Sequence, residues 1–151
     1  MTTIAAMRTV SVATEFDLPP QPAVRLWTDT GRWATFVDGF ARVLEKSDNW
    51  PEPGSKVVWE SIPAGRGRVT ERVVEHTDDC FVTEVFEERL NGTQSVRFAL
   101  GEASMELQYE LQTGGPFRAV TDALFIRRAL TDALSRTLRR FATEAAEEAS
   151  L

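Results

Sequence analysis

The carboxy-terminal segment from about Phe117 to Glu148 contains no proline and no glycine and is rich in alanine, leucine and arginine. Gly114, Gly115 and Pro116 stand directly before it, where they would separate a helix from the preceding element. At 1.5 Å per residue, a helix of this length would be roughly 45 Å long. It must pack its apolar side on another element, because isolated amphipathic helices are marginal in water. The expected apolar side consists of Val120, Leu124, Leu130, Leu134, Leu138, Phe141 and Ala145.

The first part of the chain predicts one strand and two short helices. Residues 8–16 alternate apolar and polar side chains, as a half-buried strand does. Prolines at positions 19, 20 and 22 can start a short helix but cannot lie inside one. Asp29 or Thr30 could cap a second short helix, which is expected to end at Gly39. The apolar faces of the two helices are expected to be Ala23, Val24 and Trp27, and Trp33, Phe36 and Val37.

The middle of the chain predicts about six further strands. Alternating patterns occupy residues 40–46, 56–62, 68–76, 80–90, 93–100 and 104–112. Asn91-Gly92 is a favoured hairpin sequence and is expected to form a turn. Strands joined by short turns usually pair with their neighbours, which favours an antiparallel meander. The expected fold is therefore α+β, with a curved antiparallel sheet of about six to seven strands wrapped around the long helix, in a single domain spanning residues 1–151.

The composition disfavours several classes of protein. A formal net charge of −6 disfavours nucleic acid as a partner, because such binding depends on Lys and Arg contacts to phosphates. With one histidine (His76) and one cysteine (Cys80), neither a zinc site nor an internal disulfide is expected. No glycine motif for a nucleotide is present, so no cofactor is expected. The chain shows no membrane-spanning apolar run and no apolar signal-peptide core, so we expect a soluble cytoplasmic protein without stable membrane insertion.

The order of elements resembles the helix-grip fold of the START/Bet v 1-like superfamily, also called SRPBCC, and most closely its bacterial polyketide cyclase/dehydrase-like members. This resemblance implies a cavity that binds lipids, sterols, polyketides or plant hormones and, in some members, cyclase or aromatase activity. The superfamily has no universal catalytic residue, so the resemblance assigns none. The resemblance is carried by the opening strand, the helix pair with Ala23, Val24, Trp27 and Trp33, the turn Pro53-Gly54-Ser55 leading into Lys56-Val57-Val58-Trp59, and the last helix.

One phase must be chosen for each strand, because a shift by one residue exchanges its two faces. The preferred phase places opposite charges beside one another on the outer face and leaves Val82 and Phe86 there. Facing inward are Val57, Trp59, Ser61, Val69, Glu71, Val73, Phe81, Thr83, Val85, Val96, Phe98, Leu100, Met105, Leu107, Tyr109 and Leu111. The residues predicted to contact a ligand are Trp59, Val69, Glu71, Val73, Phe81, Thr83, Val85, Phe98, Met105, Leu107, Tyr109 and Leu124.

Two of these residues are candidates for catalysis. A buried Glu71 must find a partner or have a raised pKa, so it could act as an acid or a base. It could equally pair with an arginine, meet water at the cavity mouth, or lie outside the cavity. The hydroxyl of Tyr109 could anchor a ligand or, as is more common, bond a backbone carbonyl. Thr83 and Ser61 are weaker polar candidates, and Trp59 would either line the cavity or fill it.

Three functions are compatible with these residues. The first is a carrier or sensor for a small hydrophobic molecule, which requires a cavity of about 300 Å³ or more. The second is a cyclase or aromatase in which Glu71, Tyr109 and Thr83 move protons, which ranks lower because no convincing acid–base pair is present. The third is an interaction module with a filled cavity, whose outer patch of Val58, Val82 and Phe86 could bind a second copy of the chain.

Overall fold

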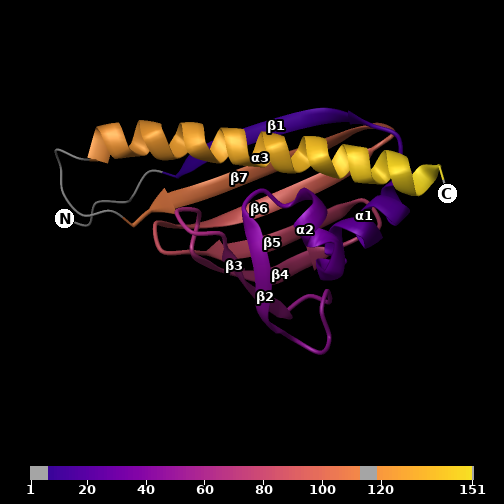
Figure 1. Cartoon of the computed structure of the whole chain (residues 1–151), viewed down its shortest axis with the longest axis horizontal. Helices are drawn as coiled ribbons and strands as arrows, with labels where there is room; N and C mark the ends of the chain where they lie inside the picture. The colour runs from indigo at the N-terminus through magenta and orange to yellow at the C-terminus, as the bar shows by residue number, and fades with distance from the viewer. Residues whose placement is uncertain (1–6, 113–118, 151) are drawn as a thin grey trace.

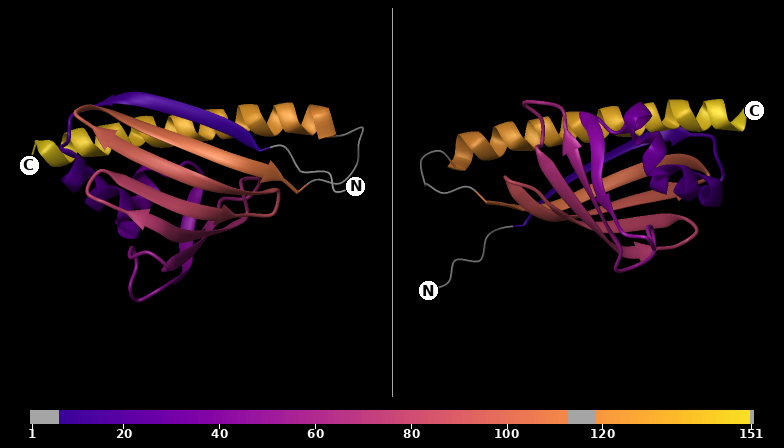
Figure 2. Two further views of the ribbon diagram at one scale, coloured as in Figure 1. Left: turned by 180° about the vertical axis from the view of Figure 1, so that it is seen from behind. Right: turned by 60° about the horizontal axis from the view of Figure 1, so that its bottom comes forward.

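The computed structural model describes residues 7–112 and 119–150, with side chains of the last helix described from Leu124 onward. A curved sheet of seven antiparallel strands has the order β1-β7-β6-β5-β4-β3-β2, and the long helix α3 runs along its β1 edge (Figures 1 and 2). The expected α+β helix-grip fold is thereby confirmed. The elements are β1 (Arg8–Phe16), α1 (Pro20–Thr28), η1 (Thr30–Arg32), α2 (Trp33–Phe36), β2 (Phe40–Lys46), β3 (Lys56–Ser61), β4 (Arg68–His76), β5 (Cys80–Phe86), β6 (Leu90–Ala99), β7 (Gly101–Leu111) and α3 (Ala119–Ala149).

The short helices begin where their sequence predicts. Pro20 opens α1, and the Asp29 carboxylate accepts a hydrogen bond from the Gly31 amide at the start of η1. Gly39 follows α2 with a φ of 73°, a backbone conformation that favours glycine. These helices lie below the carboxy-terminal half of α3 and close that end of the sheet (Figure 1).

The inner face of the sheet has the predicted phase. Val57, Trp59, Val69, Glu71 and Thr83 are all buried, as are the other inward residues of β5 and β7 up to Tyr109. On the outer face, Val58 and Val82 are each only 8% exposed, which leaves Phe86 as the exposed member of the predicted interaction patch. The described residues therefore do not present that patch as an open apolar surface.

Two predictions about the strand ends are wrong. Asn91 and Gly92 lie inside β6, and the turn occupies residues 87–89, where the Glu87 amide donates to the Leu90 carbonyl. A side chain at position 92 would collide with the Gln108 carbonyl oxygen, so glycine here permits close approach within a curved sheet. Leu100 is 89% exposed because β6 ends at Ala99, and the chain turns at Leu100 before β7.

The buried side of α3 differs from the prediction in its first turns. Leu124 is 66% exposed, whereas Ile126 is buried. Leu124 stands six positions before the buried Leu130. At about 100° per residue, its side chain therefore points about 120° away from that of Leu130 around the helix axis. The prediction for Phe117 falls outside the described residues, as does the side chain of Val120. The buried side consists of Ile126, Leu130, Leu134, Thr137, Leu138, Phe141 and Ala145.

Aromatic rings fill the interior beneath the carboxy-terminal half of α3. The centre of the Phe141 ring lies 5.1 Å from the ring centres of Trp27 and Phe36 and 5.4 Å from that of Phe98. A second group surrounds Trp33, whose ring contacts those of Phe40, Trp50 and Trp59. Close packing of this kind leaves no room for a ligand in the interior beneath that half of α3. Any larger cavity must therefore lie nearer the amino-terminal end of α3.

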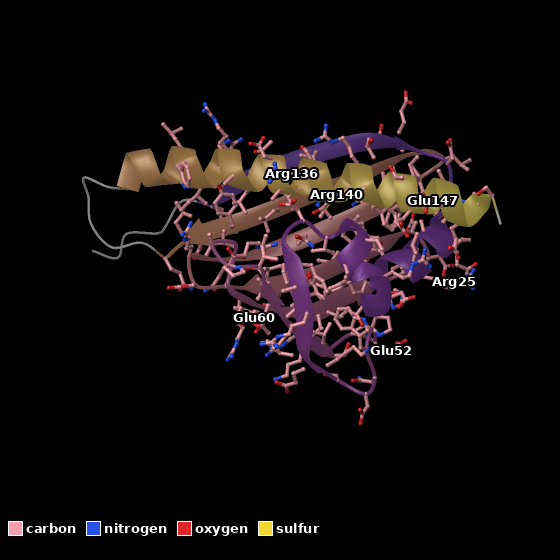
Figure 3. All side chains as sticks on the ribbon, in the orientation of Figure 1. Arg25, Glu52, Glu60, Arg136, Arg140 and Glu147 are labelled. Atoms are coloured by element: carbon pink, nitrogen blue, oxygen red, sulfur yellow. The ribbon has the colours of Figure 1, made fainter. Side chains whose placement is uncertain are left out.

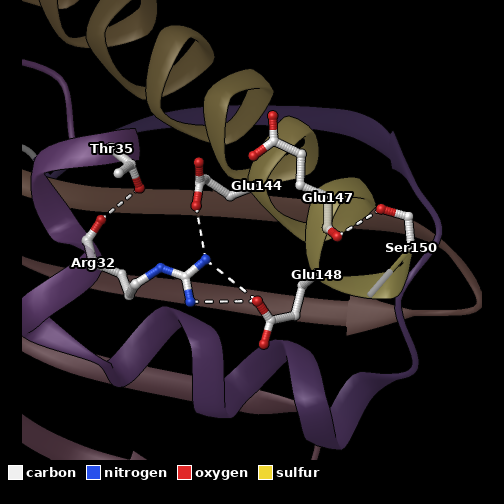
Figure 4. A network of polar contacts seen from close by, with 6 residues as sticks. All are labelled: Arg32, Thr35, Glu144, Glu147, Glu148 and Ser150. Carbon is white, nitrogen blue, oxygen red and sulfur yellow. Dashed lines mark hydrogen bonds and ion pairs between the residues drawn. The ribbon is translucent and has the colours of Figure 1, made fainter.

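Ion pairs attach the carboxy-terminal end of α3 to the short helices. Arg32 contacts Glu144 at 2.9 Å and Glu148 at 3.3 Å, so one guanidinium bridges two successive turns of α3 (Figure 4). The hydrogen bond to Glu144 is the main cause that raises the pKa of Arg32. Because these groups are partly exposed, the network positions the helix more than it stabilises the fold.

Candidate functional site

An open pocket of about 330 Å³ lies between the amino-terminal half of α3 and the loop that joins β3 to β4. Its walls also include the turn between β5 and β6. The volume falls in the range of small-molecule sites, and apolar side chains form most of the wall. The lining residues are Asp38, Gly39, Ser61, Ile62, Pro63, Ala64, Gly65, Arg66, Glu87, Arg89, Leu90, Phe125, Ile126, Ala129, Leu130, Ala133 and Arg136.

The β3–β4 loop is tightly folded around Ser61. Its hydroxyl donates to the Ile62 carbonyl at 2.9 Å and accepts from the Gly67 amide at 2.8 Å. A side chain at position 65 would come within 2.8 Å of the same hydroxyl oxygen, so glycine is needed for this close approach. Ser61 therefore shapes the pocket wall, and its hydroxyl is already used by the loop.

A second, much smaller cavity of about 30 Å³ lies deeper, between the sheet and α3. Only Trp59, Glu71 and Met105 of the predicted ligand residues line it. Its volume is about that of one water molecule. The other lining residues are Trp27, Trp33, Val37, Arg66, Gln94, Leu134 and Thr137.

Glu71 is buried inside the sheet and receives two hydrogen bonds. The indole nitrogen of Trp59 donates to Oε2 at 2.8 Å, and the Thr83 hydroxyl donates to Oε1 at 3.0 Å. Burial raises the pKa of Glu71, while the Trp59 hydrogen bond and the charge of Arg66 oppose this rise. The Glu71 carboxyl group on β4 thus links Trp59 on β3 to Thr83 on β5. Because its pKa is raised, a larger fraction of it is protonated at a given pH than of an exposed glutamate.

Arg66 lines both the pocket and the small cavity. Its Nε donates to the Glu87 carboxylate at 2.6 Å, and its guanidinium carbon lies 5.5 Å from the centre of the Trp59 ring. Nη2 is also 2.6 Å from the same Glu87 oxygen, but this atom has no well-directed acceptor among the described residues. Arg66 therefore lies at the boundary between the two spaces and is paired there with Glu87.

Tyr109 is fully buried on the inner face of β7. Sequence reasoning favoured a bond from its hydroxyl to a backbone carbonyl, but that hydroxyl has no hydrogen-bond partner within the described part of the chain. A buried hydroxyl without a partner is energetically unfavourable. Tyr109 does not line the 330 Å³ pocket.

Asp38 holds the edge of the pocket against the middle of α3. Its two carboxylate oxygens each accept a hydrogen bond of 3.0 Å from Arg136, and Arg140 adds a third at 3.1 Å. Both arginines extend from α3 beside α2 (Figure 3). The hydrogen bond from Arg136 is the main cause that lowers the pKa of Asp38. These three hydrogen bonds join α3 to the residue before Gly39 at the edge of the pocket.

The structure brings few of the predicted ligand residues together around open space. Val69, Val73, Phe81, Val85, Phe98 and Leu107 belong to the packed core. Arg66 was missed because its loop was treated only as a connection, and Glu87 and Arg89 were missed because residues 80–90 were predicted as one strand, whereas β5 ends at Phe86. For Arg66, the available sequence signal is its position between two glycines in the loop that follows an inward-facing strand.

Neither Cys80 nor His76 lines the pocket or the small cavity described above. Cys80 is buried, and burial raises the pKa of its thiol, as expected for an inert cysteine. His76 is half-buried, and its ring lies 5.5 Å from that of Phe81. This aromatic contact at the end of β4 covers part of the His76 side chain.

Replacing Glu71 with glutamine is expected to change how stability depends on pH. Because burial raises the pKa of Glu71 above its ordinary value of 4.5, the folded state binds more protons than the unfolded state just above that pH. The contribution of Glu71 to the wild-type free energy of unfolding therefore decreases as pH rises above 4.5 and the buried carboxyl group ionises. Glu71→Gln retains an acceptor for Trp59 and a donor for Thr83 but does not titrate.

The stability of Glu71→Gln relative to wild type should therefore increase as pH rises from 4.5. Urea denaturation across a pH series measures this difference, with Glu110→Gln on the exposed face of β7 as the matched control. A difference between Glu71→Gln and wild type that does not vary with pH would contradict the prediction.

Comparison with known proteins places this chain in a family. The family described as "Polyketide cyclase / dehydrase and lipid transport" matches residues 7–146, and the chain therefore belongs to it. Among curated proteins, no sequence relative matches this chain. Of the helices in the described residues, none is long and apolar enough to cross a membrane.

Solved structures share the fold at low sequence identity. The ZhuI aromatase/cyclase from Streptomyces sp. R1128 is 15% identical with a TM-score of 0.63, covering 95% of this chain and 96% of that chain. The di-domain aromatase/cyclase StfQ of the steffimycin biosynthetic pathway is 15% identical with a TM-score of 0.74, covering 96% of this chain and 53% of that chain. Norcoclaurine synthase from Thalictrum flavum is 8% identical with a TM-score of 0.70, covering 97% and 99%.

Proposed function

We propose that the protein binds a small hydrophobic molecule, such as a lipid, a polyketide or a similar metabolite, and acts as its carrier or sensor. The observation that carries this proposal is the pocket of about 330 Å³ beneath the amino-terminal half of α3. Its volume lies near the lower end of the range for ligand sites, so the guest is a small molecule or one end of a longer chain. The membership of the chain in a family with cyclase and lipid-transport proteins supports this proposal.

The polar groups of the pocket indicate what else the ligand carries. Arg66 supplies a buried donor, Nη2, that no described side chain or carbonyl accepts in good geometry. That atom is enclosed and lies 2.6 Å from Glu87, but the Arg66 side chain as a whole is 21% exposed and lines the pocket, so its positive charge would attract an oxygen of the ligand. Ile126 and Leu130 cover the opposite wall with apolar surface. A molecule with an apolar body and one oxygen-bearing end fits both features.

A cyclase or aromatase reaction is the second candidate. Glu71 favours the protonated form, lines the small cavity together with Arg66, and so could donate a proton to a substrate that reached it. Neither Glu71 nor Tyr109 lines the open pocket, however, and Glu71 is held by two donors. This arrangement favours binding over catalysis.

Native mass spectrometry of the protein purified without denaturation tests the proposal. We expect a protein peak with an added mass of one small hydrophobic molecule, which is released by organic solvent. The dye anilinonaphthalene sulfonate (ANS), which combines apolar rings with an anionic oxygen group, should compete with that molecule for the pocket. The proposal is contradicted if the folded protein shows no added mass and also no saturable ANS binding.

A further inference from the structure

The pocket and the small cavity lie under successive turns of α3. Leu130 and Ala133 line the pocket, whereas Leu134 and Thr137, each four positions further along the same side of the helix, line the cavity. Among the described residues, Arg66 is the one that lines both spaces. Its side chain therefore forms the wall between a pocket of about 330 Å³ and a cavity of about 30 Å³.

Two contacts hold this wall in place. The Arg66 guanidinium binds the Glu87 carboxylate at 2.6 Å, and its carbon lies 5.5 Å from the centre of the Trp59 ring. The Glu87 side chain is only 5% exposed, so the ion pair is shielded from water. Breaking such a pair is costly, because it leaves a buried charge without a partner. The wall is therefore a fixed part of the pocket and not a freely moving side chain.

The cavity behind the wall is suited to a polar group. Glu71, Gln94 and Thr137 bring oxygen and nitrogen atoms to its lining, while Trp59 supplies apolar surface. A mostly apolar wall with a few polar groups is typical of ligand sites. The cavity has room for about one water molecule, and the Arg66 side chain occupies the boundary across which it would join the pocket.

We propose that Arg66 determines the length of ligand that the protein accepts, by closing the inner end of the pocket. With the guanidinium on Glu87, a ligand stops at the level of Leu130 and Ala133, and any further length stays at the open mouth. Apolar surface at the mouth is not removed from water, so it adds little to the affinity. This inference deepens the proposed function and rests on it for the presence of a hydrophobic ligand.

A series of n-alcohols from pentanol to decanol, each competing with ANS, tests the depth of the pocket. For wild type, the affinity should rise with chain length and then stop rising at one length. Arg66→Ala joins the two spaces, so its affinity should continue to rise beyond that length, by about fourfold for each further methylene that is buried.

Arg89→Ala is the matched control, because Arg89 lines the pocket but not the small cavity. This variant loses the same charge from the pocket lining as Arg66→Ala does. Its affinities for the alcohols should therefore stop rising at the wild-type chain length.

Acrylamide quenching of tryptophan fluorescence tests the wall without any ligand. Three of the four tryptophans, Trp27, Trp33 and Trp59, line the small cavity. Arg66→Ala should raise the quenching constant by about twofold or more, because acrylamide then reaches rings that are enclosed in wild type. Arg89→Ala should be quenched as wild type is.

Circular dichroism establishes that each variant is folded. If Arg66→Ala does not fold because Glu87 is left without a partner, Arg66→Ala with Glu87→Gln takes its place, since it removes both charges. A folded Arg66 variant with the wild-type chain-length limit would overturn the inference, as would an equal shift in Arg89→Ala. If neither ANS nor any alcohol binds wild type, the proposed function fails, and the quenching alone then decides whether Arg66 separates the two spaces.

Discussion

Replacing Ala133 with tryptophan is expected to weaken ANS binding by at least about tenfold, because the new ring would occupy space that the ligand needs. Ala133 lies on α3, is partly exposed and lines the pocket of about 330 Å³. Its side chain faces open volume, so a larger residue need not displace the packed core. Fluorescence titration of the folded protein with ANS measures the affinity of wild type and variant.

The control for this substitution is Ala146→Trp, which adds the same ring at an exposed position near the other end of α3. This control should bind ANS as wild type does. Thermal unfolding by circular dichroism establishes that each variant is folded before binding is compared. If Ala133→Trp is folded and binds ANS with wild-type affinity, the ligand does not occupy the pocket that we assign to it.

Replacing Phe141 with alanine is expected to lower the free energy of unfolding by about 3–5 kcal/mol. The Phe141 side chain is completely buried, and its ring contacts the rings of Phe16, Trp27, Phe36 and Phe98. Removing it leaves a void where elements β1, α1, α2 and β6 meet α3. A domain of this kind is stable by only about 5–15 kcal/mol, so the loss is a large share of the total.

Urea denaturation followed by tryptophan fluorescence measures the loss, and Phe125→Ala is the matched control. Phe125 belongs to the same helix but is mostly exposed, so its substitution should change the free energy of unfolding by no more than about 0.5 kcal/mol. Similar losses in the two variants would show that the interior of the protein is not packed around Phe141.

The element order and the inward phase of the central strands were predictable from local pattern. A period of two places Trp59, Glu71 and Thr83 on one face of neighbouring strands, and the structure joins these three by hydrogen bonds. The turn at Asn91-Gly92 was mispredicted because local turn preference competes with pairing to both neighbouring strands, and the pairing prevailed. Leu124 was misplaced although the helix period alone sets it about 120° from Leu130, so the spacing of residues 124 and 130 already argued against it.

By itself, the sequence determined which residues alternate along strands and which recur along the helix, because both periods are properties of a local backbone. Only the tertiary structure decided where the interior is full and where it is open. Phe141 and Trp27 fill one end because the short helices bring their rings together, whereas the β3–β4 loop stands off from Ala129 and Ala133 at the other end. Open volume depends on how distant surfaces fit, and no local period encodes that fit.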